Sequence, residues 1–397
     1  MSERDQKNFQ HKSKISRFIF LIVLSMGAFG VMGGGLVAPA LPAISEAFGT
    51  PEEQIGLVLS IYTISAAISL PLIGYFIDSA GRRKVALFCL LLDGLAGLGS
   101  TMAASFPGLL IWRFFQGIGV AGLIPVAMTI ISDCFAGKDR VRAMGFLTGT
   151  ISIGAVIIPS LGGLLASVDW RLVFMVYGLS LILGAIFFFK LPETSPQLQK
   201  TSLSGLRTHI KSLGAAIKRP DIMIILLQSF AVYFFLYALV TFLPVMLHQY
   251  HDLGEIFSGI SLSMQGFIAA LLASRAGVFA GIMNWKSRTF LGFCLISLAF
   301  ILLPFWPQGS YLVLISMVIF GAGMGILNPT IYNRVTRLPP ENLKGSVISL
   351  FNTLKYIGMS LSPLVFSLLL LKFSMHSLFI MAGITAVSWG AALLYYG

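Results

Sequence analysis

The chain has 397 residues, of which 56% are hydrophobic and only 11% are charged, and its mean hydropathy is +0.89. A soluble domain carries roughly 25% charged residues, so this chain has too few to cover a surface that faces water. The composition excludes an ordinary soluble enzyme, a disordered protein and a soluble nucleic-acid binder. It indicates a protein whose solvent is lipid.

Twelve apolar stretches are long enough to cross a bilayer, whose hydrocarbon core needs about 20 helical residues. The stretches are continuous and do not alternate with a period of two, which favours helices over barrel strands. We therefore predict an all-α membrane protein with twelve transmembrane helices. The predicted spans are residues 18–37, 55–77, 85–104, 109–131, 143–166, 173–189, 222–247, 256–277, 290–306, 311–331, 347–371 and 378–396.

Positive charge is distributed unevenly between the two sides of the membrane. If the N-terminus lies in the cytoplasm, 22 of the 27 Lys and Arg residues fall in cytoplasmic segments, whereas the outer loops hold only Arg171 and Lys372. This bias predicts a multi-pass protein of the cell membrane with both termini in the cytoplasm. It also explains the net charge of +12 without a nucleic-acid partner, and a dedicated lipid-binding patch is the weaker alternative.

Glycine and proline landmarks of the first half recur in the second half at an offset of 202 to 204 residues. The recurring landmarks are Gly117 with Gly321, Pro125 with Pro329, Gly154 with Gly358, Pro159 with Pro363, residues 56–60 with 259–263, and Leu41-Pro42 with Leu243-Pro244. Six landmarks in register indicate two homologous halves. Because each half has six spans, the halves point the same way across the membrane, an arrangement typical of secondary transporters.

This duplication predicts two pseudo-symmetric six-helix bundles joined by a polar, basic loop. The predicted organisation is an N-terminal tail at residues 1–17, a first bundle at 18–189, a cytoplasmic central loop at 190–221 and a second bundle at 222–397. A transporter built in this way is expected to hold its site near the membrane midplane, between the two halves.

The turn after the second span has the form G-x3-D-x2-G-R-R/K-K, and Gly81 permits a sharp reversal there. The pattern resembles the signature of the major facilitator superfamily, and the twelve spans with a duplicated six-span unit extend the resemblance over the whole chain. The resemblance implies a cytoplasmic latch between the halves, and the alternative is a basic loop that only reaches toward the lipid surface. The motif residues are Gly74, Asp78, Gly81, Arg82, Arg83 and Lys84.

Arg113 lies inside the fourth span, where a charged side chain must face protein or water. The segment R-x2-Q-G-x-G is similar to the superfamily's fourth-span motif, which implies that Arg113 takes part in proton transfer. Gln116, one turn further on, is expected to share its face. The alternative is an arginine that extends to the outer surface of the membrane.

Glycines surround a proline in the fifth span, which favours close helix packing and a bend. The segment is similar to the superfamily motif G-x3-G-P-x2-G-G, which implies an antiporter, although Ile158 replaces the glycine before the proline. A purely structural bend is the alternative. The matching residues are Gly154, Pro159, Gly162 and Gly163.

Three further ionisable residues lie within spans. Asp93 is the only acid deep in the membrane, and it is a candidate for proton coupling together with Arg113; a structural hydrogen bond is the alternative. Arg275 lies near the end of its span, where its side chain can reach the lipid surface. Lys355 lies deep in the eleventh span and could bind an anionic substrate group or act in coupling.

Other polar side chains at helical spacing are candidates for a substrate cavity, although such residues more often pack between helices. With Lys355 they are Gln116, Tyr233, Tyr237, Asn328, Tyr332 and Asn352.

No phosphate-binding loop, metal-ligand cluster or nucleophile elbow is visible in the sequence, so we expect neither an enzyme nor a cofactor or metal site. The expected function is alternating-access transport in which a proton gradient drives the export of small amphipathic molecules of the drug type. The chain is expected to act as a monomer in the bilayer. One alternative is a transporter of an organic anion, such as a siderophore, a lipid-linked metabolite or a sugar acid, with Lys355 as the anion site. A transport-incompetent sensor on the same fold is less favoured.

Overall fold

The computed structural model describes residues 17–191, 193–194, 213–214, 216–309, 311–340 and 343–396. Within these ranges, twelve helical segments are long and apolar enough to cross a membrane, one for each span predicted from the sequence. The predicted all-α fold is therefore confirmed. Residues 1–16 of the predicted tail and most of the predicted central loop lie outside the described residues.

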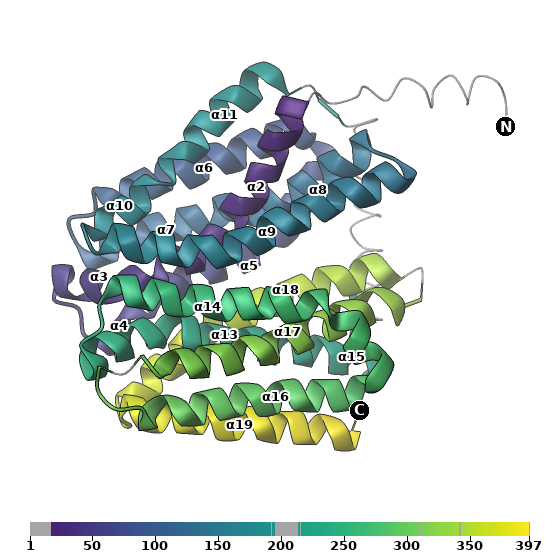
Figure 1. The fold of residues 1–397 in the computed structure, drawn as a ribbon. Coiled ribbons are helices and arrows are strands. Elements are labelled where there is room, and N and C mark those ends of the chain that lie inside the picture. The colour runs from purple at the N-terminus through teal and green to yellow at the C-terminus, as the bar shows by residue number, and fades with distance from the viewer. Residues whose placement is uncertain are drawn as a thin grey trace, which may run out of the picture.

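The elements fall into two groups that follow the two halves of the chain (Figure 1). The first group consists of α2 (Arg17–Gly35), η1 (Ala38–Ala40), α3 (Leu41–Phe48), α4 (Glu52–Ile55), α5 (Leu57–Ser79), α6 (Arg82–Thr101), α7 (Phe106–Ala121), α8 (Leu123–Cys134), α9 (Gly137–Ala166), α10 (Trp170–Met175) and α11 (Gly178–Lys190). The second consists of α13 (Pro220–His251), α14 (Glu255–Ser274), α15 (Ala276–Ile282), α16 (Trp285–Leu302), η2 (Leu303–Phe305), α17 (Val313–Arg337), α18 (Lys344–Leu370) and α19 (Met375–Tyr396).

Several helices extend beyond the predicted spans into the charged segments. The helix α9 begins at Gly137, so Lys138 and Arg142, predicted to lie in a loop, belong to its first turns. In the same way α17 continues past residue 331 and includes Arg334. Hydropathy marks where the hydrocarbon core ends, whereas a helix can satisfy its backbone hydrogen bonds beyond that point, so the two boundaries differ.

The two groups of helices lie close together at one end and separate toward the other (Figure 1). We call the close end, which contains residues 41–55, the α3–α4 end, and the opposite end the α15 end. The first group meets the second mainly where α9 packs against α14 and where α5 packs against α18. These two helix pairs form the seam between the bundles, and they position the residues discussed below.

Candidate functional site

The seam between α9 and α14 is built from small residues. Gly163 lies so close to the backbone carbonyl of Glu255 that a side chain there would overlap it, and Gly259 lies equally close to the carbonyl of Pro159. The Ser160 hydroxyl bonds to the Ser263 hydroxyl at 2.7 Å. The predicted close helix packing in the fifth span is confirmed, and it joins the two halves of the protein.

Two other glycines of the fifth-span motif, Gly154 and Gly162, face the first bundle. A side chain on Gly162 would overlap the carbonyl of Leu36, and one on Gly154 would meet Val31 of α2. Adjacent glycines of α9 therefore serve two different neighbours, because successive helical positions point about 100° apart.

The seam between α5 and α18 is also built from a glycine–proline contact and a serine hydrogen bond. Gly56, which immediately precedes α5, lies against the Pro363 side chain, where an added Cβ would sit 3.0 Å from the proline Cβ. The Ser60 hydroxyl donates a hydrogen bond to the Ser360 carbonyl at 3.0 Å. All of these contacts lie in the parts of the four helices nearer the α3–α4 end.

Two side chains of α13 also cross between the bundles. His248 Nε2 lies 3.0 Å from the Glu46 carboxylate of α3, and both side chains are partly exposed. Deeper in the protein, a Cβ added at Gly34 of α2 would sit 2.7 Å from the Tyr237 hydroxyl oxygen. Tyr237, predicted as a cavity residue, is thus buried at the contact between the bundles.

Arg113 is fully buried within the first bundle, so the alternative of an arginine at the outer surface is wrong. Its guanidinium donates hydrogen bonds to Gln116 Oε1 at 2.6 Å, to the Gly33 carbonyl at 3.0 Å and to the Val58 carbonyl at 3.1 Å. It also lies 4.1 Å from the centre of the Tyr62 ring. Gln116 shares the face of Arg113, as predicted, and the guanidinium links α7 to α2 and α5.

Asp93 is also fully buried, in the middle of α6. Its Oδ2 accepts a hydrogen bond from the Ser180 hydroxyl at 2.6 Å. The other carboxylate oxygen has no hydrogen-bond partner among the described residues, and neither has the amide nitrogen of Gln116. Asp93 interacts electrostatically with Gln116 and Arg113, so the two candidates for proton coupling belong to one buried polar group.

Lys355 lies about 16 Å along α18, by helix rise, from the start of that helix. Its ammonium lies 4.9 Å from the centre of the Tyr233 ring and 5.7 Å from that of Tyr356. The Tyr233 hydroxyl is 3.2 Å from the Tyr332 hydroxyl. The structure therefore brings three of the predicted cavity residues together in one cluster, and it adds Tyr356.

The remaining cavity candidates are less closely connected. Asn352 donates a hydrogen bond to the Ile348 carbonyl of its own helix at 3.1 Å, and Asn328 is partly buried. Arg275 is exposed between α14 and α15, as expected for an arginine at the end of its span.

The turn between α5 and α6 has the predicted sharp reversal, because Gly81 adopts a φ of 98°. The Arg82 side chain donates to Asp133 at 3.0 Å, and the backbone N–H groups of Arg82 and Arg83 donate to the Glu193 carboxylate. These contacts join residues of the first bundle to one another and to Glu193, just after α11, and none of them reaches the second bundle. The side chain of Asp78 is outside the described residues, so the predicted latch between the halves stays a prediction.

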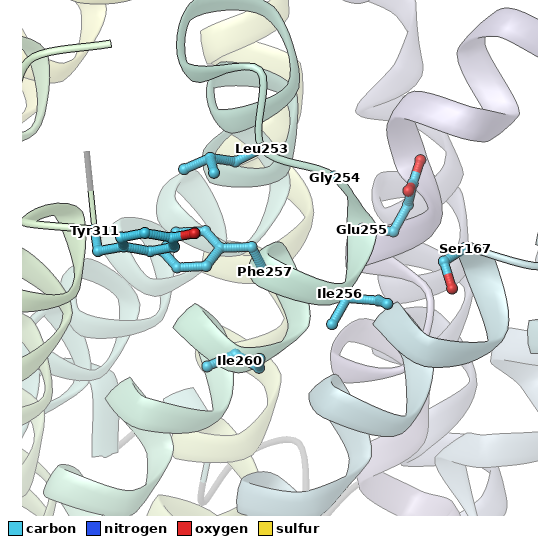
Figure 2. Close-up of a pocket in the computed structure, with 8 residues that line it drawn as sticks. All are labelled: Ser167, Leu253, Gly254, Glu255, Ile256, Phe257, Ile260 and Tyr311. Atoms are coloured by element: carbon cyan, nitrogen blue, oxygen red, sulfur yellow. The ribbon is translucent and has the colours of Figure 1, made fainter. Parts of the chain in front are cut away.

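A shallow pocket of about 380 Å³ lies at the α3–α4 end (Figure 2). It is bounded by Ser167 after α9, by the start of α14 and by Tyr311, whose ring packs on Phe257 at a centroid distance of 5.3 Å. None of the predicted site residues lines it. The pocket marks the edge of the seam, because Glu255 contributes to both.

Sequence reasoning missed several residues that complete these groups. Tyr62, Ser180 and Tyr356 are uncharged and lie in apolar stretches, so nothing in the pattern distinguishes them from packing residues. Asp133 and Glu193 had a usable signal, because each is an acid just beyond an apolar run on the side that carries the basic residues.

Comparisons with known proteins agree with this architecture. The chain is 28% identical over 354 residues to the bacillibactin exporter of Bacillus subtilis, with 85% of this chain and 86% of the relative covered. It is 26% identical to multidrug resistance protein 1 of the same organism, with 89% of each chain covered. The first relative is named as an exporter, and the second is named for resistance to drugs.

Solved structures show the same fold at low identity. A D-xylose–proton symporter superposes with a TM-score of 0.79 at 16% identity, covering 94% of this chain and 96% of that one. An inward-facing bacterial homologue of the human lysosomal transporter Spinster gives a TM-score of 0.74 at 18% identity, covering 96% and 94%. The sequence profile of the Major Facilitator Superfamily matches residues 23–363, and the chain therefore belongs to this superfamily of membrane transporters.

Proposed function

We propose that this transporter is a proton-coupled exporter of small amphipathic organic molecules. The observation that carries the proposal is the buried group formed by Asp93, Gln116 and Arg113. It contains a carboxylate oxygen with no described partner inside an apolar bundle. An unpartnered polar atom in such a place is costly, so it is retained where it has a function.

The arrangement of the group suggests how protonation affects the bundles. Adding a proton to Asp93 removes its charge and changes the field acting on Arg113, which is held by backbone carbonyls of Gly33 and Val58. Gly33 precedes Gly34, which meets Tyr237 across the bundles, and Val58 lies two residues from the Gly56 contact. A change at Asp93 thus reaches both α2 and α5 where they touch the second bundle.

The position of the seam supports alternating access. In this structure the bundles meet at the α3–α4 end, which we assign to the outside because the positive residues gather at the other end. Export then requires the seam to open after substrate has entered from the cytoplasm. The energy source would be the proton gradient of the cell membrane, with no cofactor, and the chain would act as a monomer.

The curated relatives support export as the direction. Besides the bacillibactin exporter and the multidrug resistance protein already described, the tetracycline resistance protein of class H from Pasteurella multocida is 25% identical over 371 residues, and its name too describes resistance to a drug. Because these names include a bacillibactin exporter, siderophore-like molecules are within the range of substrates to test.

The test is uphill transport in proteoliposomes with an imposed pH step, on the wild type and on Asp93→Asn. The amide keeps the shape of the carboxyl group but cannot exchange a proton. We expect Asp93→Asn to lose uphill transport at least tenfold while exchange of substrate down its own gradient continues. Asp169→Asn, the same change at an exposed acid outside the bundle core, is the matched control. Uphill transport by Asp93→Asn, or by wild type without an ion gradient, would exclude the proposal.

A further inference from the structure

Lys355 is a cation inside the membrane-spanning region that has no anionic partner among the described residues. Lys355 makes neither an ion pair nor a hydrogen bond with the residues that the structure describes, and only the faces of Tyr233 and Tyr356 approach its ammonium. Arg113, by contrast, is held by three oxygen acceptors and is fully buried. The two cations therefore differ in kind: the charge of Arg113 is satisfied internally, whereas that of Lys355 is available to a ligand.

The surroundings of Lys355 are aromatic and partly open. Tyr332 is 42% exposed, and its ring also packs edge-on against Phe351 with the centroids 5.1 Å apart. The Tyr233–Tyr332 contact uses one hydroxyl as donor, which leaves the hydroxyl hydrogen of the other free to bond elsewhere. The cluster consequently offers an ammonium, a phenol donor and aromatic faces on side chains that contact one another.

We propose that Lys355, Tyr233 and Tyr332 bind the anionic group of an aromatic substrate. The ammonium would pair with a carboxylate or a comparable anion, the free phenol would donate to it, and the tyrosine and phenylalanine rings would pack against the aromatic part. This inference rests on the proposed transport function and narrows its substrate class to aromatic anions.

The location of the cluster fits a site that alternates between the two sides. Its residues come from α13, α17 and α18 of the second bundle, and α18 also packs on α5 of the first. Tyr356, beside Lys355, is an electrostatic neighbour of Tyr62, which covers Arg113. An anion at Lys355 would thus lie next to the contact between the halves, on the opposite side from the buried Asp93 group.

Binding without a gradient tests the inference separately from transport. The probes are 2-naphthoate, its neutral isostere 2-naphthamide and the aliphatic anion decahydro-2-naphthoate, titrated calorimetrically into the purified full chain in nanodiscs. We expect wild type to bind 2-naphthoate at least tenfold more tightly than either of the others. Equal binding of the naphthoate and the naphthamide, or no binding of the naphthoate, would overturn the inference.

Variants then test whether the preference for naphthoate depends on Lys355 and Tyr332. Lys355→Gln should lower the preference for naphthoate over naphthamide to within about twofold. Lys355→Arg, which retains the positive charge, should keep most of this preference. Tyr332→Phe should weaken naphthoate binding severalfold. Lys372→Gln, the same change at an exposed lysine just beyond α18, is the control and should bind as wild type does. Retained naphthamide binding shows that Lys355→Gln is folded. If Lys355→Gln keeps the full preference, the inference fails.

Failure of the inference and failure of the proposed function are distinguishable. Uphill transport under a pH step, assayed with 2-naphthoate and with the cationic dye ethidium, reports on proton coupling, whereas the naphthoate titration contains no gradient. Ethidium transport without naphthoate preference would reject only the substrate class. Naphthoate preference without gradient-driven transport would reject only the coupling.

Discussion

Gly259 packs against the backbone of Pro159, and this contact joins the two halves of the protein. Its counterpart in the duplicated sequence is the contact between Gly56 and Pro363, since Gly259 corresponds to Gly56 and Pro159 to Pro363. In both contacts, therefore, a glycine of one repeat meets the proline of the other repeat. Two of the six landmarks that identify the internal repeat, the pair Pro159 and Pro363 and the segments that contain Gly56 and Gly259, thus lie in the seam between the bundles.

This reciprocal arrangement explains why small residues persist at matching positions of both repeats. An interface related by a twofold axis uses the same surface patch from each side. Without a hydrophobic driving force between helices in lipid, close backbone approach supplies the packing. Ser60 and Ser263, which correspond in the two repeats, each add a hydrogen bond across the seam, to the Ser360 carbonyl and the Ser160 hydroxyl respectively.

We expect Gly259→Leu to open the α3–α4 end. The side chain would occupy the space of the Pro159 carbonyl, so the seam could not close as it does here. Spin labels at Gln54 and Lys372, introduced into a variant without the three native cysteines, should show their distance distribution shifted to longer values. Transport should fall at least tenfold.

Gly149→Leu is the matched control for this change, because Gly149 also lies within a helix but has nothing within 4 Å of an added Cβ. Its label distances and transport should resemble those of the parent protein. An unchanged distance distribution in Gly259→Leu would show that this glycine contact does not hold the end closed.

Arg113→Met should destabilise the protein. The substitution leaves Gln116 Oε1 and two backbone carbonyls buried without their donor, at a cost of about 3 kcal/mol or more. The midpoint of thermal unfolding in detergent should fall by roughly 5 °C. Arg275→Met, which removes an exposed arginine, should leave the midpoint within about 1 °C. Equal unfolding midpoints for the two variants would show that the Arg113 contacts do not stabilise the folded protein.

Much of the fold was predictable from the sequence for a physical reason. A lipid core demands long continuous apolar helices, so the spans that begin near Phe18 and end near Tyr396 are visible in hydropathy alone. Glycine and proline mark close packing and bends, so the repeat was visible as well. The beginning of α9 and the end of α17 could not be predicted in this way, because charged residues continue a helix as readily as they end a span.

The candidate site was predictable only where charge marked it. Arg113 and Lys355 are conspicuous because a charge within an apolar run needs an explanation. Tyr62 lies beside Arg113, and Tyr356 lies beside Lys355. Neither tyrosine is conspicuous in the sequence, since an aromatic residue in a membrane helix is usually a packing residue. Which polar residues meet depends on how α6, α7 and α11 pack, and no local pattern contains that information.

A double-mutant cycle should show coupling between Arg82 and Asp133. Their side chains meet at 3.0 Å and are only 11% and 16% exposed, so solvent screens the pair weakly. We expect Arg82→Gln and Asp133→Asn each to lower the free energy of unfolding, and the double variant to lose about 1 to 3 kcal/mol less than the sum. Chemical unfolding of the purified protein measures these losses. Additive losses would mean that the pair contributes no net interaction.

Acid pH should favour closure of the α3–α4 end through His248 and Glu46. A proton on the His248 imidazole gives it a positive charge that attracts both Glu46, 3.0 Å away, and its electrostatic neighbour Glu52. Because His248 and Glu46 are 39% and 69% exposed, the gain is below about 1 kcal/mol, so the closed population should rise no more than about fivefold. Label distances between Gln54 and Lys372 at pH 5.5 and 8 measure this shift. It should disappear in His248→Gln and persist in His376→Gln, and an equal shift in both variants would assign the pH response to another group.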